Sequence, residues 1–461
     1  MRITFHALYC TLLLLLFIIG CDGTDESLRQ SEELIRSGKH DEAVALLAQV
    51  IADDDRNPKA RILMAQAHEA LGNYDRAIPQ FKAAIRLYVA QPEDRAMARL
   101  QLAKIYLRLG VRKEGVNQLR AIVHSTSDNA VIQQVAGLVS DAYHVIQITK
   151  GNPANFSPNF SLDGKQIAFA SSRLGNSEIY LIDVNGSNLQ QVTSTPDFNE
   201  DTPRFLGDSR YIVHSREPKS AGEVHIVLQS DGTTPVYAGI YATHLDREVT
   251  HELLPLGLGV RAPCLSPDWK RVVYEASRNR TLDLYTLDLR DINLENIGAH
   301  TIIPTPITDS EADEGSPTFF PDGKQIAFVS AGPEGTGPRR AAPGRSKPLH
   351  QIYTINIDGS DEKHLNPNPY DCYSPVIAPD GKTMAFVSGR MDDIEIYLMD
   401  IDGTNERRIT NGIGVSVQPA FSPDGKKLVF VSDRSGTLQI YLMFFDQPVT
   451  RDMLIQHLQG E

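Results

Sequence analysis

Two different hydrophobic periods divide the chain. From Asp25 to His144, apolar residues recur at helical spacing among Ala, Leu, Arg, Gln and Glu, with little β signal. Beyond residue 144, short apolar runs such as IAFVS and LVFVS alternate with turn sequences such as SPDG. Helical spacing predicts amphipathic helices, whereas short apolar runs bounded by Pro, Asp and Gly predict strands. The sequence therefore predicts a helical region followed by an all-β region.

The helical region repeats itself. Gly38, Gly72 and Gly110 are each predicted to end one helix, and they lie 34 and 38 residues apart. A second helix follows each glycine, with small and apolar residues at helical spacing: His40, Ala43, Leu47 and Val50; Tyr74, Ala77, Phe81 and Ala84; Arg112, Gly115, Leu119 and Ile122. A period of 34 residues is typical of helix–turn–helix repeats, and LGNYDRAIPQFKAAI resembles the tetratricopeptide-repeat family. A non-repeating helical bundle is the alternative.

Two details complete this picture. The four extra residues of the second interval predict a loop insertion at Ala90–Asp94, next to Pro92, and Asn129–Tyr143 predicts a helix that caps the stack. The resemblance implies a concave groove for a peptide or partner helix, or a dimer surface, without catalysis.

The β region contains one motif six times. Each copy has an aspartate in a turn between two apolar strands, at Asp163, Asp208, Asp268, Asp322, Asp380 and Asp424. A further strand is predicted after each copy, at residues 178–186, 223–232, 283–291, 351–359, 395–403 and 439–447. Three copies close with a segment ending in threonine, at Thr193, Thr308 and Thr410. Strands at a period of about 40–60 residues indicate the blades of a β-propeller.

The residue types of the motif explain its turns. Proline fixes one turn dihedral, glycine allows the positive one, and aspartate bonds to nearby backbone. The six aspartates are therefore interpreted as turn formers rather than catalytic or metal-binding groups. The arginines that end the following strand are interpreted in the same structural way: Arg173, Arg216, Arg278, Arg390 and Arg434.

The ring is predicted to close through its N-terminal end. The residues after the last copy match the outer-strand pattern poorly, whereas HVIQIT at His144–Thr149 matches the closing segments QQVT and RRIT. We therefore expect this strand to complete the sixth blade.

The N-terminus reads as an export signal. Arg2 precedes an apolar stretch from Leu12 to Ile19 that is short for a membrane helix. The sequence Ile-Ile-Gly-Cys that ends at Cys21 resembles a bacterial lipoprotein signal, and this resemblance implies acylation of Cys21. An ordinary signal peptide is the alternative. Asp22 resembles an inner-membrane retention signal, which favours the inner over the outer membrane.

The composition of the chain limits the classes of partner and ligand that we expect. The net charge of −13 argues against nucleic acid as a partner. In the folded part only Cys264 and Cys372 remain, and they are predicted to be two unpaired, buried thiols. No cofactor is indicated. No metal site is predicted either, since the spacing of His244, Asp246, His251 and Glu252 fits no established site.

One insertion has the opposite charge to the rest of the chain. Residues 331–350 introduce Pro, Gly and the cations Arg339, Arg340, Arg345 and Lys347 between two predicted strands of the fourth blade. This segment is either a disordered loop or an arm that contacts a partner.

The repeated pattern SPDGK, IAFVS, IYLMDIDG and RRIT resembles the six-bladed, WD40-like propeller of the TolB family over residues 145–461. The expected domains are a signal peptide at 1–20, a tetratricopeptide-repeat domain at 21–144 and a propeller at 145–461. The resemblance implies a non-catalytic scaffold of the bacterial periplasm that binds envelope proteins, including a peptidoglycan-associated lipoprotein, and the lipid would hold it at the membrane. TolB itself carries an α/β domain where this chain has helical repeats.

The rival interpretation is an enzyme. Related propellers cover the active sites of prolyl-oligopeptidase-type peptidases, and others resemble sugar lyases. The peptidases need a Gly-x-Ser-x-Gly elbow, which we do not find. A carbohydrate- or peptide-processing site within the propeller channel stays open.

Overall fold

The computed structural model describes residues 24–207, 210–219, 238–247, 249–256, 259–278, 281–290, 304–331, 349–365, 370–390, 393–411 and 414–459. The chain forms two compact units, Met1–Val135 with Thr450–Glu461, and Ala136–Val449. The sequence placed all of 145–461 in the propeller, whereas residues 450–461 group with the helices. Within the described ranges, no helix combines the length and the apolar character needed to cross a membrane.

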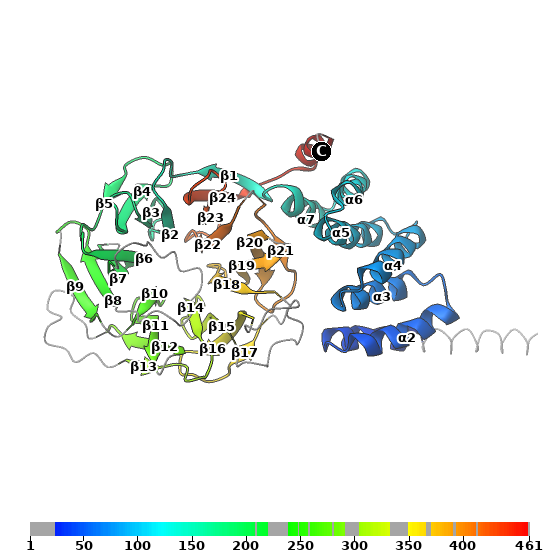
Figure 1. Ribbon diagram of the computed structural model, residues 1–461, viewed down its shortest axis with the longest axis horizontal. Coiled ribbons are helices and arrows are strands. Elements are labelled where there is room, and N and C mark those ends of the chain that lie inside the picture. The colour runs from blue at the N-terminus through cyan, green and yellow to red at the C-terminus, as the bar shows by residue number, and fades with distance from the viewer. Residues whose placement is uncertain are drawn as a thin grey trace, which may run out of the picture. The chain divides into compact units, whose positions relative to one another are not determined.

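The first unit consists of helices that pack on their neighbours in sequence, α2 on α3, α3 on α4, α4 on α5 and α5 on α6. Residues 24–36 are also helical. The numbered helices, shown in Figure 1, are α2 His40–Asp53, α3 Pro58–Ala70, α4 Tyr74–Leu87, α5 Pro92–Arg108, α6 Arg112–Ser125, α7 Asn129–Val139 and α8 Arg451–Gln459. This arrangement confirms the predicted tetratricopeptide-repeat region.

Glycine ends the first helix of each repeat, as predicted. Gly38, Gly72 and Gly110 have φ of 76°, 72° and 70°, a conformation that side chains with a Cβ disfavour. The N–H of the residue after Gly72 donates to the carbonyl of His68 at 2.8 Å. Such a bond closes the helix end in a Schellman motif.

The predicted loop insertion at Ala90–Asp94 is wrong. α3 has 13 residues and α5 has 17. Each is preceded by a four-residue link, residues 54–57 and 88–91. The four extra residues therefore lengthen α5, because Pro92 occupies a first-turn position, where a missing N–H costs nothing.

The predicted cap helix also differs. α7 ends at Val139, and Tyr143 begins strand β1, because this segment pairs with the propeller. In the helical unit, the C-terminal α8 packs against α6 and buries Leu454 and Leu458. The Arg451 Nε donates to the carbonyl of Val123 at 2.6 Å.

The second unit is a ring of six four-stranded antiparallel sheets (Figure 1). Blade 1 is β2 Asn155–Phe160, β3 Gln166–Ser171, β4 Glu178–Asp183 and β5 Gln190–Gln191; blade 2 is β6 Phe198–Leu206, β7 Tyr211–Pro218, β8 Gly239–His244 and β9 Thr250–Leu254; blade 3 is β10 Arg261–Leu265, β11 Arg271–Arg278, β12 Thr281–Asp288 and β13 Thr305–Pro306. Blade 4 is β14 Glu314–Phe319, β15 Gln325–Ser330, β16 Gln351–Asn356 and β17 Lys363–His364; blade 5 is β18 Cys372–Ile377, β19 Thr383–Arg390, β20 Asp393–Asp400 and β21 Arg407–Arg408. Blade 6 is β22 Ser416–Phe421, β23 Lys427–Ser432 and β24 Gln439–Pro448, joined by β1 Tyr143–Gln147. The predicted six-bladed propeller is confirmed.

The second strand of each blade forms the core. In β3, β15 and β23 every residue after the first is buried. Single apolar clusters combine residues of blades 6 and 1, blades 3 and 4, and blades 4 and 5. A strand that lies between two neighbouring blades needs apolar residues on both faces, which explains the IAFVS runs.

The ring closes as predicted. β1 pairs antiparallel with β24, and Val145 lies opposite Met443. The sixth sheet has the order β1-β24-β23-β22, so its outermost strand comes from the N-terminal end of the propeller.

One strand prediction is wrong. The strand that pairs with β7 is β8, and His214 lies opposite Tyr241 in this pair. The predicted segment 223–232 lies outside the described residues. The sequence GIYATHLD, which begins with β8, follows the IYLID pattern of blade 1 more closely than EVHIVLQSD does.

Candidate functional site

The first strands of the six blades surround a central cavity of 520 Å³. Each strand shifts register in its middle, at a residue with left-handed backbone that is followed by proline. These residues are Ser157, Thr202, Ala262, Ser316, Ser374 and Gln418, with φ between 47° and 52°, and all six line the cavity. A left-handed conformation costs a residue with a Cβ roughly 1–2 kcal/mol. Bulges of this kind redirect side chains and are frequent next to binding sites.

Side chains from the same or the neighbouring blade stabilise these bulges. The N–H of Ser157 donates to Gln418 Oε1 at 2.8 Å, and the N–H of Ser316 donates to Glu275 Oε1 at 2.7 Å. Thr202 donates its N–H to its own neighbour, the Asp201 carboxylate, at 2.6 Å. Three polar side chains that line the central cavity therefore hold the bulges in place.

The residues that line the cavity include the titratable groups Asp201, Arg204 and Cys264. Burial raises the pKa of the Asp201 carboxyl, and hydrogen bonds from Ser157 and Thr202 oppose this rise. Burial also raises the pKa of the Cys264 thiol, although the charge of Arg204 acts in the other direction. A thiol with a raised pKa stays protonated and is a poor nucleophile.

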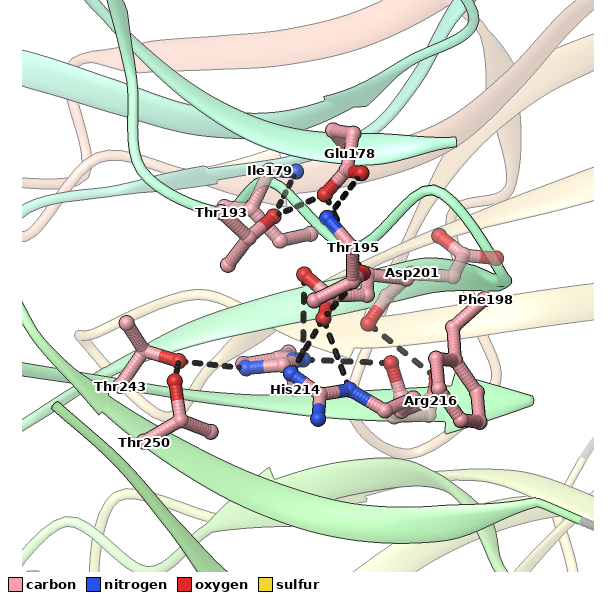
Figure 2. A network of polar contacts seen from close by, with 12 residues as sticks. Glu178, Ile179, Thr193, Thr195, Phe198, Asp201, His214, Arg216, Thr243 and Thr250 are labelled. Carbon is pink, nitrogen blue, oxygen red and sulfur yellow. Dashed lines mark hydrogen bonds and ion pairs between the residues drawn. The ribbon is translucent and has the colours of Figure 1, made fainter. Parts of the chain in front are cut away.

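A buried polar network joins blades 1 and 2 (Figure 2). Arg216 pairs with Glu200 through Nη2 at 2.6 Å and lies over the Tyr241 ring at 4.3 Å. The hydroxyl of Thr195 donates to Glu200 at 3.0 Å, and its N–H donates to Glu178 at 2.5 Å. The two blades are thereby connected through two buried carboxylates.

His214 lies beside this network. Its Nε2 is 2.9 Å from Thr243 Oγ1, and burial lowers the pKa of its imidazole. A neutral histidine that is completely buried and bonded within the sheet cannot reach a ligand in the channel. We therefore regard His214 as part of the core.

The predicted structural arginines share one geometry. The guanidinium carbons of Arg173, Arg390 and Arg434 lie 4.3, 4.6 and 5.2 Å from the rings of Tyr180, Tyr397 and Tyr441. Each Nε donates to a serine hydroxyl two residues earlier at 3.0–3.1 Å. Cation–π contacts of this type stabilise the join between strands. The Arg278 side chain lies outside the described part of the chain.

The turn aspartates accept hydrogen bonds within their own turns. Asp163 Oδ1 accepts from the Ser161 hydroxyl at 2.7 Å and from the N–H of Lys165 at 3.1 Å. Asp268 and Asp424 likewise accept from the hydroxyls of Ser266 and Ser422, respectively. Asp322 and Asp380 accept the N–H two residues later at 2.9 and 2.8 Å. Asp208 lies outside the described residues, as do Cys21 and the cations Arg339, Arg340, Arg345 and Lys347.

The bulges were missed at the sequence level, although a signal for them exists. A proline stands five residues before each of the six turn aspartates, at Pro158, Pro203, Pro263, Pro317, Pro375 and Pro419. The residue before each proline is the left-handed one. This spacing is constant even for Asp208, whose own turn sequence has diverged.

The considered metal ligands are not assembled. Over the described ranges, no group of three or more His, Cys, Asp or Glu residues could hold a metal ion. His244 Nδ1 accepts the N–H of Asp246 at 3.0 Å, and Glu252 accepts the Tyr241 hydroxyl at 3.0 Å. Cys264 and Cys372 form no disulfide; Cys372 is buried, as predicted, whereas Cys264 is only half-buried.

Comparisons with protein families identify both units. A family model for the TolB β-propeller domain matches residues 345–457, and a tetratricopeptide-repeat model matches residues 34–93. The chain therefore carries a TolB-type propeller with N-terminal tetratricopeptide repeats.

Individual relatives cover parts of the chain. An uncharacterized protein of Agrobacterium fabrum is 29% identical over 50% of this chain and 65% of that protein. The Tol-Pal system protein TolB of Francisella tularensis subsp. mediasiatica is 26% identical over 41% of this chain and 39% of that protein. The chain thus spans less than two thirds of these relatives. An uncharacterized peptidase of Bacillus subtilis is 26% identical over 28% of this chain and 17% of that protein.

Solved structures are similar to the chain at low identity. A putative TolB from Agrobacterium tumefaciens is 20% identical, with a TM-score of 0.45 over 67% of this chain and 99% of that chain. An oligogalacturonate lyase in complex with manganese is 15% identical, with a TM-score of 0.44 over 68% of this chain and 95% of that chain.

Proposed function

Because the chain joins tetratricopeptide repeats to a TolB-type β-propeller, we propose that it is a non-catalytic protein-binding scaffold of the bacterial cell envelope. One observation carries this proposal. Six left-handed bulges, one from each blade, surround a cavity of 520 Å³ and give it a fixed lining. A rigid concave surface of this kind suits recognition of a partner segment.

The engagement of the channel groups supports binding rather than chemistry. Gln418, Glu275 and Asp201 accept hydrogen bonds from the bulge N–H groups, so their acceptors serve the fold. The Cys264 thiol stays protonated because burial raises its pKa. These groups are suited to define a shape and a charge pattern rather than to act as a nucleophile or base.

The partner class follows from the relatives. The Francisella relatives are named as proteins of the Tol-Pal system. We propose envelope proteins as partners, including a peptidoglycan-associated lipoprotein. The helical repeats would supply a second binding surface on the same chain, and two weak contacts on one chain raise the effective affinity.

Membrane attachment is a further part of the proposal. We propose that Cys21 is acylated and holds the protein at the periplasmic side of a membrane, with Asp22 favouring the inner one. The cations Arg339, Arg340, Arg345 and Lys347 are proposed as an additional contact with an acidic partner. The turn aspartates are proposed to act only in the fold.

Site-specific crosslinking in the intact envelope tests the proposal. The photoreactive residue p-benzoylphenylalanine would replace Trp269 or Tyr373, which line the cavity, in the full-length chain. Leu189, 47% exposed on a blade 1 turn away from the cavity, is the control position. We expect defined protein adducts from the two cavity positions and none from Leu189.

The opposite results are equally informative. Adducts of equal yield at Leu189, or none at either cavity position, would contradict a binding role for the channel. Turnover of oligosaccharides or peptides by the purified chain would instead support the enzyme interpretation.

A further inference from the structure

Blade 2 contains a set of three interacting groups: a cation, a carboxylate and an aromatic ring. Arg216 is bonded to the Glu200 carboxylate at 2.6 Å and stacks on Tyr241 at 4.3 Å. Glu200 lies two residues before the left-handed Thr202, directly opposite Arg216 in the β6–β7 ladder. The cation thus has a carboxylate on one side and an aromatic face on the other.

Blade 4 repeats two of these three groups. Glu314 lies two residues before the left-handed Ser316, as Glu200 does before Thr202. Tyr353 lies opposite Phe328, the position that Tyr241 takes opposite His214. However, the residue opposite Glu314 is Ser330, where blade 2 has Arg216.

The Glu314 carboxylate is buried without a cation. Glu314 is only 3% exposed. Its Oε1 accepts a hydrogen bond from the Ser310 hydroxyl at 2.7 Å, whereas its Oε2 has no hydrogen-bond partner. No ion pair involving Glu314 occurs within the described ranges. A buried carboxylate in this state is expensive unless a cation or a proton neutralises it.

The surroundings add negative charge. Burial is the largest cause that raises the pKa of Glu314, and the hydroxyls of Thr308 and Ser310 oppose this rise. The charges of Asp283, 2% exposed, and of Glu362 raise the pKa further. Glu275 is also near, since its carboxylate packs over Gly315, but it is paired with Arg261 at 2.8 Å. Glu314 is therefore the carboxylate that needs a cation.

The aromatic side of the site is also present. Tyr353 is half-buried, with His364 stacked at 4.6 Å and Phe328 at 5.8 Å. Within the described part of the chain, no arginine lies over its ring, whereas arginines lie over the equivalent tyrosines of blades 1, 2, 5 and 6. Glu314 is one of the residues that line the central cavity.

We propose that blade 4 binds the guanidinium group of an arginine side chain from a peptide partner, held between the Glu314 carboxylate and the Tyr353 ring. This site rests on the proposed function, because the channel must admit a partner segment. Arginine fits better than lysine, since a planar guanidinium pairs with a carboxylate through two N–H groups and stacks on an aromatic face. Blade 2 shows that these two groups accommodate a guanidinium in this fold.

The test uses the full-length chain and a small probe. Binding of Nα-acetyl-arginine-methylamide is followed by NMR titration, with the lysine and citrulline analogues as comparisons. We expect the arginine probe to bind most tightly, the lysine probe several-fold more weakly and the neutral citrulline probe not at all. Equal binding of citrulline would overturn the proposal.

Variants locate the site. Glu314→Gln should weaken binding of the arginine probe at least tenfold, and Tyr353→Leu should weaken it several-fold. Asp361→Asn, which changes an exposed acid of the same blade, should leave binding within twofold. Unchanged binding by a folded Glu314→Gln protein would overturn the proposal.

A second variant distinguishes loss of the binding site from misfolding, because it is expected to stabilise the protein. Ser330→Arg places an arginine opposite Glu314, as Arg216 stands opposite Glu200. It should raise the melting temperature and abolish probe binding. A lower melting temperature with intact probe binding would contradict the site.

Two further results separate the sources of failure. If replacing Arg339, Arg340 and Arg345 by Gln strengthens probe binding, an arginine of this chain competes for the site, which overturns its assignment to a partner. If crosslinking at Trp269 captures an envelope protein but the probe does not bind, this inference fails and the proposed function stands.

Discussion

The side-chain hydroxyl of Thr149 accepts a hydrogen bond from the N–H of Ile440 at 2.9 Å, across 291 residues of chain. The same bond occurs inside other blades, where Thr193, Thr308 and Thr410 each accept an N–H of the third strand at 2.9 Å. In those blades the threonine lies 14–24 residues after the residue that donates the N–H. Thr149 thus performs the standard task of a closing segment, but from the N-terminal end of the propeller.

This relationship predicts the effect of Thr149→Val. The substitution keeps the shape of the side chain but removes the hydroxyl that accepts from the buried N–H of Ile440, which costs about 1–3 kcal/mol. Chemical denaturation should show this loss. Deletion of residues 144–149 should lower the stability of the whole propeller much further, and equal melting of the truncated and intact proteins would contradict closure at β1.

Gly137 is predicted to be intolerant of a side chain. A Cβ at this position would lie 2.0 Å from the carbonyl oxygen of Arg408, so the backbone must shift. Gly137→Ala should destabilise the propeller unit by about 1–3 kcal/mol. Gly389→Ala is the matched control, because nothing lies within 4 Å of its added Cβ; equal effects of the two substitutions would argue against the close approach.

Trp269 is predicted to be a strained turn residue. Its φ is 55°, at the position where four other turns have glycines with φ of 66–68°, and it is 40% exposed. Trp269→Gly should raise the stability by about 1 kcal/mol, because glycine adopts this conformation at little steric cost. Differential scanning calorimetry measures the change. A lower melting temperature would show that packing of the indole outweighs the strain.

Glu314 predicts a stability that depends on pH. Burial raises the pKa of its carboxyl to about 7, above the ordinary value of 4.5. Between these values the unfolded chain is ionised while the folded chain holds the proton, so stability falls as pH rises from about 5 to 8, by on the order of 3 kcal/mol. In Glu314→Gln this component should disappear from melting curves. An unchanged pH profile in the variant would assign the dependence to another group.

The C-terminal helix is predicted to stabilise the helical unit. Leu454 is completely buried where α8 packs against α6, whereas the adjacent Met453 is 55% exposed. Leu454→Ala should cost about 2–5 kcal/mol and Met453→Ala almost nothing. Hydrogen exchange of α6 amides would report the difference, and protection equal to that of the unmodified chain would contradict the contact.

Several features of the fold follow from local chemistry and could be predicted from the residues alone. Gly72 ends its helix because a left-handed residue is needed there, and each SPDG turn follows from its own four residues. The repeat of six turns also fixed the number of blades. The closing strand could also be predicted, because His144–Thr149 carries the same side-chain pattern as the closing segments of the other blades.

Packing between distant segments sets which residues meet. The placement of α8 against α6, the choice of Gly239–His244 as third strand of blade 2 and the extension of α5 depend on packing between segments that local patterns do not describe. The Glu314 site has the same origin. Nothing in EADEGSP marks it as special, since it is defined by Ser330 standing where Arg216 stands in blade 2, and burial within the ring makes the missing charge matter.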